Sequence, residues 1–154
     1  MKLNSSNHSK YLILYHIVFC PKFRYKVLIE KQNLNIQSRL KDLIYNIANI
    51  YDFKIIEIEI MPDHIHLFVS TKPNTSPTNV VQIIKLITAR RLFEEFTTLK
   101  QFYSRCGHLW SRGYFVCSVG NANSETIKKL YKKSKIQVKY LTFYIKYDKI
   151  LYFN

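Results

Sequence analysis

Residues 54–71 read KIIEIEIMPDHIHLFVST, and no other stretch of the chain is as informative about the fold. Isoleucine alternates with glutamate over residues 54–60, which is the period of a strand with one buried face. The residues expected on that buried face are Ile56, Ile58 and Ile60. The sequence MPD at residues 61–63 favours a tight turn, and the apolar run over residues 65–71 predicts a second strand. The whole stretch therefore predicts a β-hairpin.

The flanking segments supply the other strands and the helices. The apolar run YLILYHIVFC predicts a strand buried on both faces, and two stretches with apolar residues at helical spacing predict amphipathic helices. The expected elements are a strand at residues 11–20, a helix at 31–51, the hairpin, a helix at 77–96 that begins at Ser76 and Pro77, a strand at 114–119, and a short helix from Asn123 or Ser124. This order predicts an α+β fold of the ferredoxin-like, split βαβ type, with an antiparallel four-stranded sheet, helices on one face and an extra C-terminal helix.

The chain divides into one domain and a tail of different composition. Residues 1–131 carry all of these elements, which suits a single domain. Over residues 132–154, lysine and tyrosine alternate with isoleucine, leucine and phenylalanine without a helical or strand period. We expect this C-terminal tail to be atypical or poorly ordered.

The composition combines a strongly positive charge with enough apolar residues for a core. The chain of 154 residues has 24 Lys and Arg against 10 Asp and Glu, a formal net charge of +14, and 47% of its residues are hydrophobic. This balance favours a polyanionic partner, although charge alone leaves both nucleic acid and an anionic membrane surface open. The polar residues 1–10, the scattered cysteines and the lack of a long apolar run favour a cytoplasmic protein without a membrane span.

His64 and His66 are the candidate metal ligands. Residues two apart on a strand point to the same face, so the two imidazoles can converge on one divalent ion, while Ile65 faces the core. Such an ion would keep open positions for a phosphate oxygen. Two histidines at this spacing also occur on ordinary surface strands. The apolar residue between them and the basic character of the chain favour the metal site.

Three segments carry a resemblance to a known family: YHIVFCPKFRYKVL at residues 15–28, EIEIMPDHIHLFVS at 57–70 and LWSRGYFVCSVGNANSETIKK at 109–129. A weaker match, IIKLITARRLF, lies at residues 83–93. In order and spacing the sequence resembles the IS200/IS605-type transposases, the single-tyrosine members of the HUH endonuclease superfamily.

This resemblance implies an activity, a cofactor and partners. It implies an enzyme that cuts and rejoins single-stranded DNA at the ends of an insertion sequence, with a tyrosine forming a 5′-phosphotyrosine link and releasing a 3′-OH. It also implies Mg²⁺ or Mn²⁺ held by the two histidines, DNA with hairpin ends as substrate, and a homodimer without membrane association. A Lewis acid suits this chemistry, because a tyrosine hydroxyl is a weak nucleophile at neutral pH.

The resemblance places the nucleophile on the short helix after the fourth strand, where the candidate is Tyr131. A tyrosine on an amphipathic helix can also be a packing or surface residue. In the family the tyrosine directly follows two lysines, whereas here Leu130 intervenes, and one residue rotates a helical side chain by about 100°. The family's metal-binding glutamine four residues later is replaced by Lys135. Gln137, six residues after the tyrosine, is the remaining candidate for that role.

A single-base insertion near codon 130 is our hypothesis for this departure, because an AT-rich gene read out of frame would produce a tail rich in Lys, Tyr, Ile and Phe. The alternative function is then a catalytically impaired DNA-hairpin-binding protein derived from such a transposase. An RNA-binding module of the same shape is a third hypothesis. It is disfavoured because His64 and His66 occupy the strand where paired stacking aromatics would be expected.

Several basic residues are candidates for DNA contacts, although each alone could be an ordinary surface charge. The set that we expect to contact phosphates is Lys22, Arg24, Lys26, Lys85, Arg90 and Arg112. We expect Trp110 to be a packing anchor, and Asp63 to serve the turn ahead of orienting His64. The long apolar strand at residues 11–20 is the expected edge at which two subunits join, with each catalytic helix able to serve the other subunit's histidines.

Overall fold

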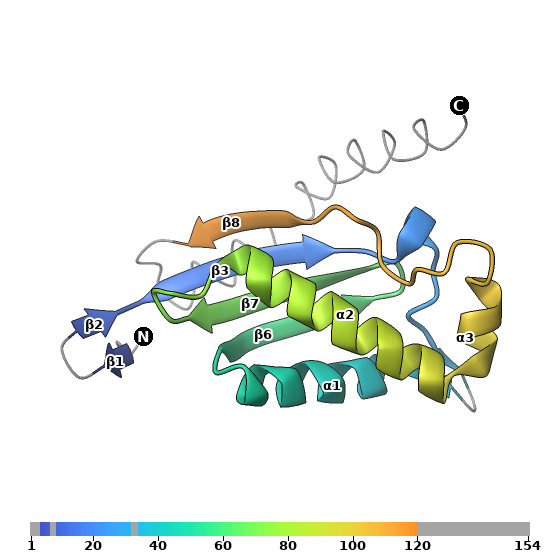
Figure 1. Ribbon diagram of the computed structural model, residues 1–154, viewed down its shortest axis with the longest axis horizontal. Coiled ribbons are helices and arrows are strands. Elements are labelled where there is room, and N and C mark those ends of the chain that lie inside the picture. The colour runs from blue at the N-terminus through green and yellow to red at the C-terminus, as the bar shows by residue number, and fades with distance from the viewer. Residues whose placement is uncertain (1–3, 7–8, 32–33, 120–154) are drawn as a thin grey trace.

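The protein is an α+β fold built on one antiparallel sheet. The structure, a computed structural model, describes residues 4–6, 9–31 and 34–119. Its sheet has the order β6-β7-β3-β8, formed by β3 (Ile13–Phe19), β6 (Lys54–Met61), β7 (His64–Thr71) and β8 (Phe115–Val119). The helices α1 (Ile36–Ile50) and α2 (Pro77–Glu95) lie side by side over one face of this sheet (Figure 1). This arrangement confirms the predicted ferredoxin-like fold.

Smaller elements complete the described part of the chain. They are the hairpin of β1 (Asn4–Ser6) and β2 (Ser9–Tyr11), the short 3-10 helix η1 (Lys22–Arg24), the hairpin of β4 (Glu30–Lys31) and β5 (Leu34–Asn35), and α3 (Thr97–Phe102). The β4–β5 hairpin explains why α1 begins at Ile36 and not at residue 31 as expected. At α2 the predicted start is confirmed, because the Ser76 hydroxyl accepts a hydrogen bond from the Asn79 amide at 3.2 Å.

Strand β3 is an interior strand, so the expected subunit contact along it is wrong. It pairs with β7 on one side and with β8 on the other, and Ile17 is opposite both Leu67 and Val116. The dense apolar sequence of this strand reflects burial on both faces in the middle of the sheet, and not an unpaired edge. Within the described residues, the edge strands of this sheet are β6 and β8.

The core lies between the sheet and the two helices. Ile17, Ile65 and Leu67 of the sheet pack with Ile44 of α1 and Ile84 of α2, all of them fully buried. The contiguous burial of these side chains is the main source of stability for such a layer.

A β-bulge changes one expectation for β6. The pairing of β6 with β7 shifts between Ile55 and Glu57, so Ile56 is the extra residue. Ile55, Ile58 and Ile60 pack against the core, whereas Ile56 is exposed. The prediction that Ile56 shares the buried face is therefore wrong.

The face of the sheet away from the helices carries both apolar and titratable side chains. Leu14, Phe68 and Val119 form a second buried cluster there, next to the buried His16 and His66. None of the helices in the described part of the chain is long and apolar enough to cross a membrane.

Candidate metal site and basic groove

His64 and His66 lie at the start of β7, on the face of the sheet opposite the helices. Ile65 between them is fully buried in the core, as the strand period predicts. The two imidazole rings are adjacent, with centroids 4.9 Å apart and planes at 76°. Both rings therefore occupy the same face, which is the geometry that a shared ion needs.

The ring of His64 is held by Asp63. Oδ1 of Asp63 lies 2.6 Å from Nδ1 of His64, and its Oδ2 accepts a hydrogen bond from Nε of Arg24 at 2.8 Å. Burial opposes the charge on this carboxylate, but the hydrogen bond to His64 and the charge of Arg24 outweigh it, so the pKa of Asp63 is lowered. Asp63 thus holds the His64 ring, which is the second of the two roles expected for it.

The ring of His66 is held by His16, a residue that the sequence reasoning missed. Nε2 of His16 lies 3.0 Å from Nδ1 of His66, and the rings are stacked with an interplanar angle of 10°. Burial lowers the pKa of each ring to about 4, so both are neutral near pH 7. The one signal in the sequence was a histidine in an otherwise apolar strand.

These contacts fit a site for a divalent ion. Because Nδ1 of His64 and of His66 each has a hydrogen-bonding partner, the ligand atoms of both rings would be Nε2. Among the described residues, no group of three or more His, Cys, Asp and Glu side chains is placed to hold a metal. An ion on this pair would therefore complete its coordination with water, substrate oxygens or further groups.

Four of the six predicted DNA-contacting residues line one groove. The groove has a volume of about 770 Å³ and lies between α2 and the loop before β8. Its basic lining residues are Lys22, Lys85, Arg90 and Arg112. It is on the helical side of the sheet, whereas His64 and His66 are on the opposite face. Arg24 and Lys26 do not line the groove; Arg24 binds Asp63, and Lys26 is exposed.

Lys85 is engaged inside the protein. Its ammonium group donates hydrogen bonds to the carbonyls of Ser111 at 3.0 Å and Gly113 at 2.9 Å, and it lies over the rings of Phe19 and Tyr114. Burial lowers the pKa of Lys85 to about 8. These contacts hold the loop before β8 against α2, so Lys85 shapes the groove from within.

The contacts of Trp110 and Arg90 show how these two residues are held in the structure. Trp110 is buried, packs edge-on against Phe19, and donates a hydrogen bond from Nε1 to the Thr88 hydroxyl at 3.0 Å. The prediction that it is a packing anchor is confirmed. Arg90 is exposed and pairs with Glu94 one helical turn later.

The predicted nucleophile lies outside the described residues. Tyr131, Gln137, the short helix expected from Asn123 or Ser124, and the tail at residues 132–154 are all beyond residue 119. Their roles stay predictions.

Known proteins resemble this chain in sequence over most of its length. The chain matches the family described as "Transposase IS200 like" over residues 9–132. The chain belongs to this IS200-like transposase family. It is 32% identical over 119 residues to the ISDra2 transposase TnpA of Deinococcus radiodurans, which covers 77% of this chain and 81% of that protein. It is also 32% identical over 113 residues to the transposase for insertion sequence element IS200 of Salmonella typhimurium, with 73% and 71% covered.

A solved structure supports the same assignment. The crystal structure of a protein from Deinococcus radiodurans R1 superposes with a TM-score of 0.68 at 28% sequence identity. The match covers 84% of this chain and 96% of that chain. The resemblance that the sequence motifs suggested is confirmed by these comparisons, and so is the fold that it implied.

Proposed function

We propose that this IS200-like transposase nicks and rejoins single-stranded DNA at insertion-sequence ends through a 5′-phosphotyrosine intermediate, with Tyr131 as the nucleophile. The observation that carries the proposal is the pairing of His64 and His66 on one face of the sheet, each with Nδ1 held by a neighbour. We propose Mg²⁺ or Mn²⁺ as the cofactor, with Nε2 of both histidines as its protein ligands. When bound there, the ion would polarise the scissile phosphate.

Tyr131, Asp63 and His16 would have different roles in the proposed reaction. The Tyr131 hydroxyl attacks the phosphorus and releases its proton to solvent, the bond to the 3′-oxygen breaks, and that oxygen takes up a proton and leaves as a 3′-OH. Rejoining is the reverse step, in which a 3′-OH attacks the phosphotyrosine and the phenolate leaves. Asp63 and His16 act on this reaction only by holding the two histidine rings.

The basic groove supports a DNA substrate, and we propose that this DNA has hairpin ends. Arg90 and Arg112 are exposed and bring positive charge to its walls, whereas Lys22 is buried where it lines the groove. Exposed positive charge binds phosphates with little dependence on sequence. The groove and the histidines lie on opposite faces of the sheet, so one face would hold a DNA end while the other acts on the adjoining single strand. We also propose a homodimer, and joining of the sheets edge to edge would have to use β6 or β8.

A covalent-adduct assay tests this function. The protein is mixed with single-stranded DNA that carries the ends of its element, with Mn²⁺, and run on a denaturing gel beside Tyr131→Phe and His64→Ala. We expect a metal-dependent adduct in the wild type and none in either variant. An adduct that survives in Tyr131→Phe would show that another residue is the nucleophile.

A second candidate function follows from the sequence around Tyr131. The inserted Leu130 and the replacement of the family's glutamine by Lys135 favour a catalytically impaired protein that still binds DNA hairpins. Hairpin binding in a gel-shift assay without any adduct would support this candidate. Sequencing the gene tests the frameshift hypothesis, which is wrong if no other frame after codon 129 continues with Tyr-Ile in a family-like helix.

A further inference from the structure

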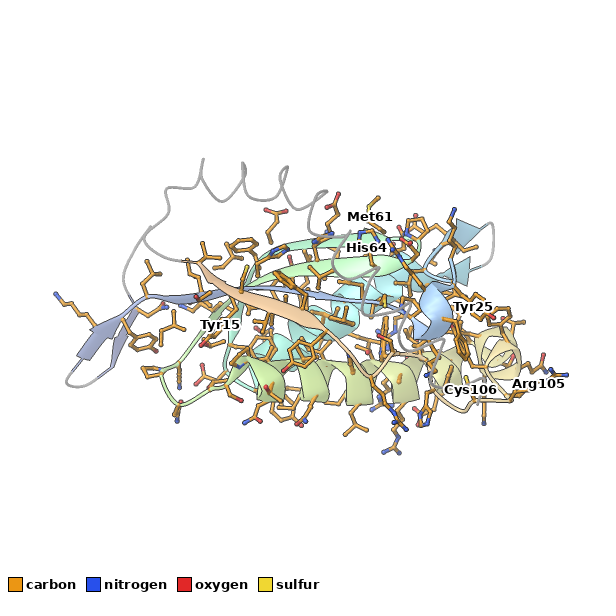
Figure 2. The ribbon with its side chains drawn as sticks, turned by 90° about the horizontal axis from the view of Figure 1, so that it is seen from above. Tyr15, Tyr25, Met61, His64, Arg105 and Cys106 are labelled. Atoms are coloured by element: carbon orange, nitrogen blue, oxygen red, sulfur yellow. The ribbon has the colours of Figure 1, made fainter. Side chains whose placement is uncertain are left out.

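An exposed pair of aromatic rings lies at the end of the molecule where His64 is found. Tyr25 is 45% exposed and Phe102 is 57% exposed, and their rings meet edge to face with centroids 5.2 Å apart. Figure 2 shows Tyr25 and Arg105 toward the same end of the molecule as His64. Single apolar side chains are common on protein surfaces, but two adjoining aromatic rings offer an apolar surface on which a further ring can stack.

The pair rests on a fixed support. Tyr103 is buried and contacts both rings, with centroids 5.1 Å from Phe102 and 6.3 Å from Tyr25. Its hydroxyl donates to the backbone carbonyl of Lys22 at 3.4 Å, which joins α3 to η1. Phe23 adds a further ring contact to Tyr25 at 5.6 Å. The two exposed rings are therefore positioned before any ligand arrives, which lowers the entropy that binding costs.

The backbone that presents Tyr25 is strained and tied to the candidate metal site. Phe23 and Arg24 both adopt left-handed conformations, with φ values of 59° and 54°, although neither is glycine. Such strain persists only where the surroundings impose it, and it is found most often at functional sites. Here Arg24 binds Asp63, which in turn holds the His64 ring. The turn that exposes Tyr25 is thus linked by two hydrogen bonds to a candidate metal ligand.

The two segments that carry the rings have only positive charges of their own, and Asp63 of the neighbouring turn binds Arg24. Residues 20–29 and 97–108, which carry the two rings, contain no Asp or Glu. Their basic residues are Lys22, Arg24, Lys26, Lys100 and Arg105. Lys22 is buried and Arg24 is bound to Asp63, so the exposed positive charges are those of Lys26, Lys100 and Arg105. Aromatic rings set among positive charges are the common means of binding single-stranded nucleic acid, because bases stack on the rings while phosphates meet the charges. We favour nucleic acid over a protein or lipid partner here because the chain belongs to a family of transposases, which act on DNA.

We propose that Tyr25 and Phe102 form a stacking site for an unpaired base of the single-stranded DNA, between the basic groove and His64. Lys22 lines the groove, Arg24 reaches toward His64 through Asp63, and Tyr25 follows directly in the chain. The site would hold the strand that runs from the groove on one face to the histidines on the other. This inference rests on the proposed function, since it assigns a subsite for the same substrate.

Binding measurements with matched variants test the stacking site. Fluorescence anisotropy with a labelled single-stranded oligonucleotide from the element end is compared for the wild type, Tyr25→Ala and Phe102→Ala. We expect each variant to bind about tenfold more weakly, or about 1.4 kcal/mol. Tyr25→Trp should keep wild-type affinity, because it retains a stacking ring. Tyr51→Ala is the control, since Tyr51 is 44% exposed but lies at the end of α1, and it should bind as the wild type does.

Two further readouts separate stacking from charge. Tyr25→Ala should leave the dependence of affinity on salt unchanged, whereas Lys26→Gln should reduce it. In a set of oligonucleotides with one abasic position each, the wild type should lose affinity at one particular position. Tyr25→Ala should be insensitive to base removal at that same position.

The outcomes distinguish the subsite from the function. If the wild type binds no single-stranded DNA, the proposed function fails. If it binds, and Tyr25→Ala and Phe102→Ala match Tyr51→Ala, the stacking site is wrong while the function stands. If the two variants instead change the oligomeric state in sedimentation and keep wild-type affinity for DNA, the surface is a contact between subunits and the proposal is overturned. Thermal unfolding confirms that each variant is folded.

Discussion

Replacing His16 with phenylalanine would test how the candidate metal site is built. A neutral imidazole carries one N–H, so His66 can bind a metal through Nε2 only when its proton is on Nδ1. That proton then points at Nε2 of His16, 3.0 Å away, which must accept it. In the binding-competent tautomer, His16 is therefore the acceptor, and it selects the nitrogen that His66 offers to the ion.

The size of the effect follows from what phenylalanine keeps and loses. The new ring would occupy the same space between His66 and Phe68, whose centroids each lie 5.3 Å from that of His16. It has no acceptor, and a buried donor that loses its partner costs about 1–3 kcal/mol. Loss of the group that orients a metal-binding histidine typically weakens metal binding about 10–100-fold. These two ranges agree, because about 1.4 kcal/mol corresponds to a factor of ten.

Calorimetric titration of the DNA-free protein with Mn²⁺ gives the measurement. We expect His16→Phe to bind Mn²⁺ about 10–100-fold more weakly than the wild type, and His16→Gln, whose amide oxygen can accept the hydrogen bond, to restore most of the loss. Nitrogen-15 NMR of the imidazole rings reports the tautomer directly, and it should show the His66 proton on Nδ1 in the wild type. Equal affinity in His16→Phe and wild type, or a proton on Nε2 of His66 in the wild type, would show that His16 does not select the metal-binding tautomer.

Three further predictions follow from other contacts. Asp63→Asn removes the negative charge that contacts both Arg24 and His64, so Mn²⁺ binding should weaken about tenfold in the same calorimetric titration. Unchanged affinity for Mn²⁺ would mean that Asp63 serves only the turn. The pKa of Lys85 is lowered from 10.5 to about 8, so between these pH values the unfolded chain holds a proton that the folded protein has released. The free energy of unfolding of the wild type, measured in urea, should therefore rise with pH across this window relative to that of Lys85→Met. The same pH dependence in both proteins would contradict the lowered pKa of Lys85. Ile17→Ala should cost about 2–5 kcal/mol of the free energy of unfolding, because Ile17 is fully buried between sheet and helices; a loss below about 1 kcal/mol would show that the core collapses to fill the space.

Local periodicity accounts for what the sequence predicted well. The alternation in residues 54–71 was sufficient for the hairpin, and the spacing of two between His64 and His66 was sufficient for their common face. The Ser76 and Pro77 signal was likewise local, and it located the start of α2. Each of these features depends on residues only a few positions apart.

The sequence patterns did not predict the features that depend on pairing between strands far apart in the sequence. His16 meets His66 only because β3 lies beside β7 in a particular register, with Val18 opposite His66. A local pattern does not specify that register, since a shift of one residue would exchange the two faces. The interior position of β3 depends in the same way on β8, about 100 residues later in the chain. The bulge at Ile56 also depends on how β6 pairs with its partner, so period alone placed that residue on the wrong face.

The positive residues show why charge counts predict a partner better than they predict a contact. From the sequence, Arg24, Lys85, Lys26 and Arg112 were equivalent candidates for phosphate binding. In the structure Arg24 binds the carboxylate that holds His64, and Lys85 binds the carbonyls of the loop before β8, whereas Lys26 and Arg112 are exposed. Arg24 and Lys85, whose charges are bound within the protein, affect DNA binding through the structure that they hold in place. Their loss should change the geometry of the metal site or the groove more than the salt dependence of DNA binding. The net charge predicts that a polyanion binds. The hydrogen bonds within the protein determine which positive side chains remain available to contact that polyanion.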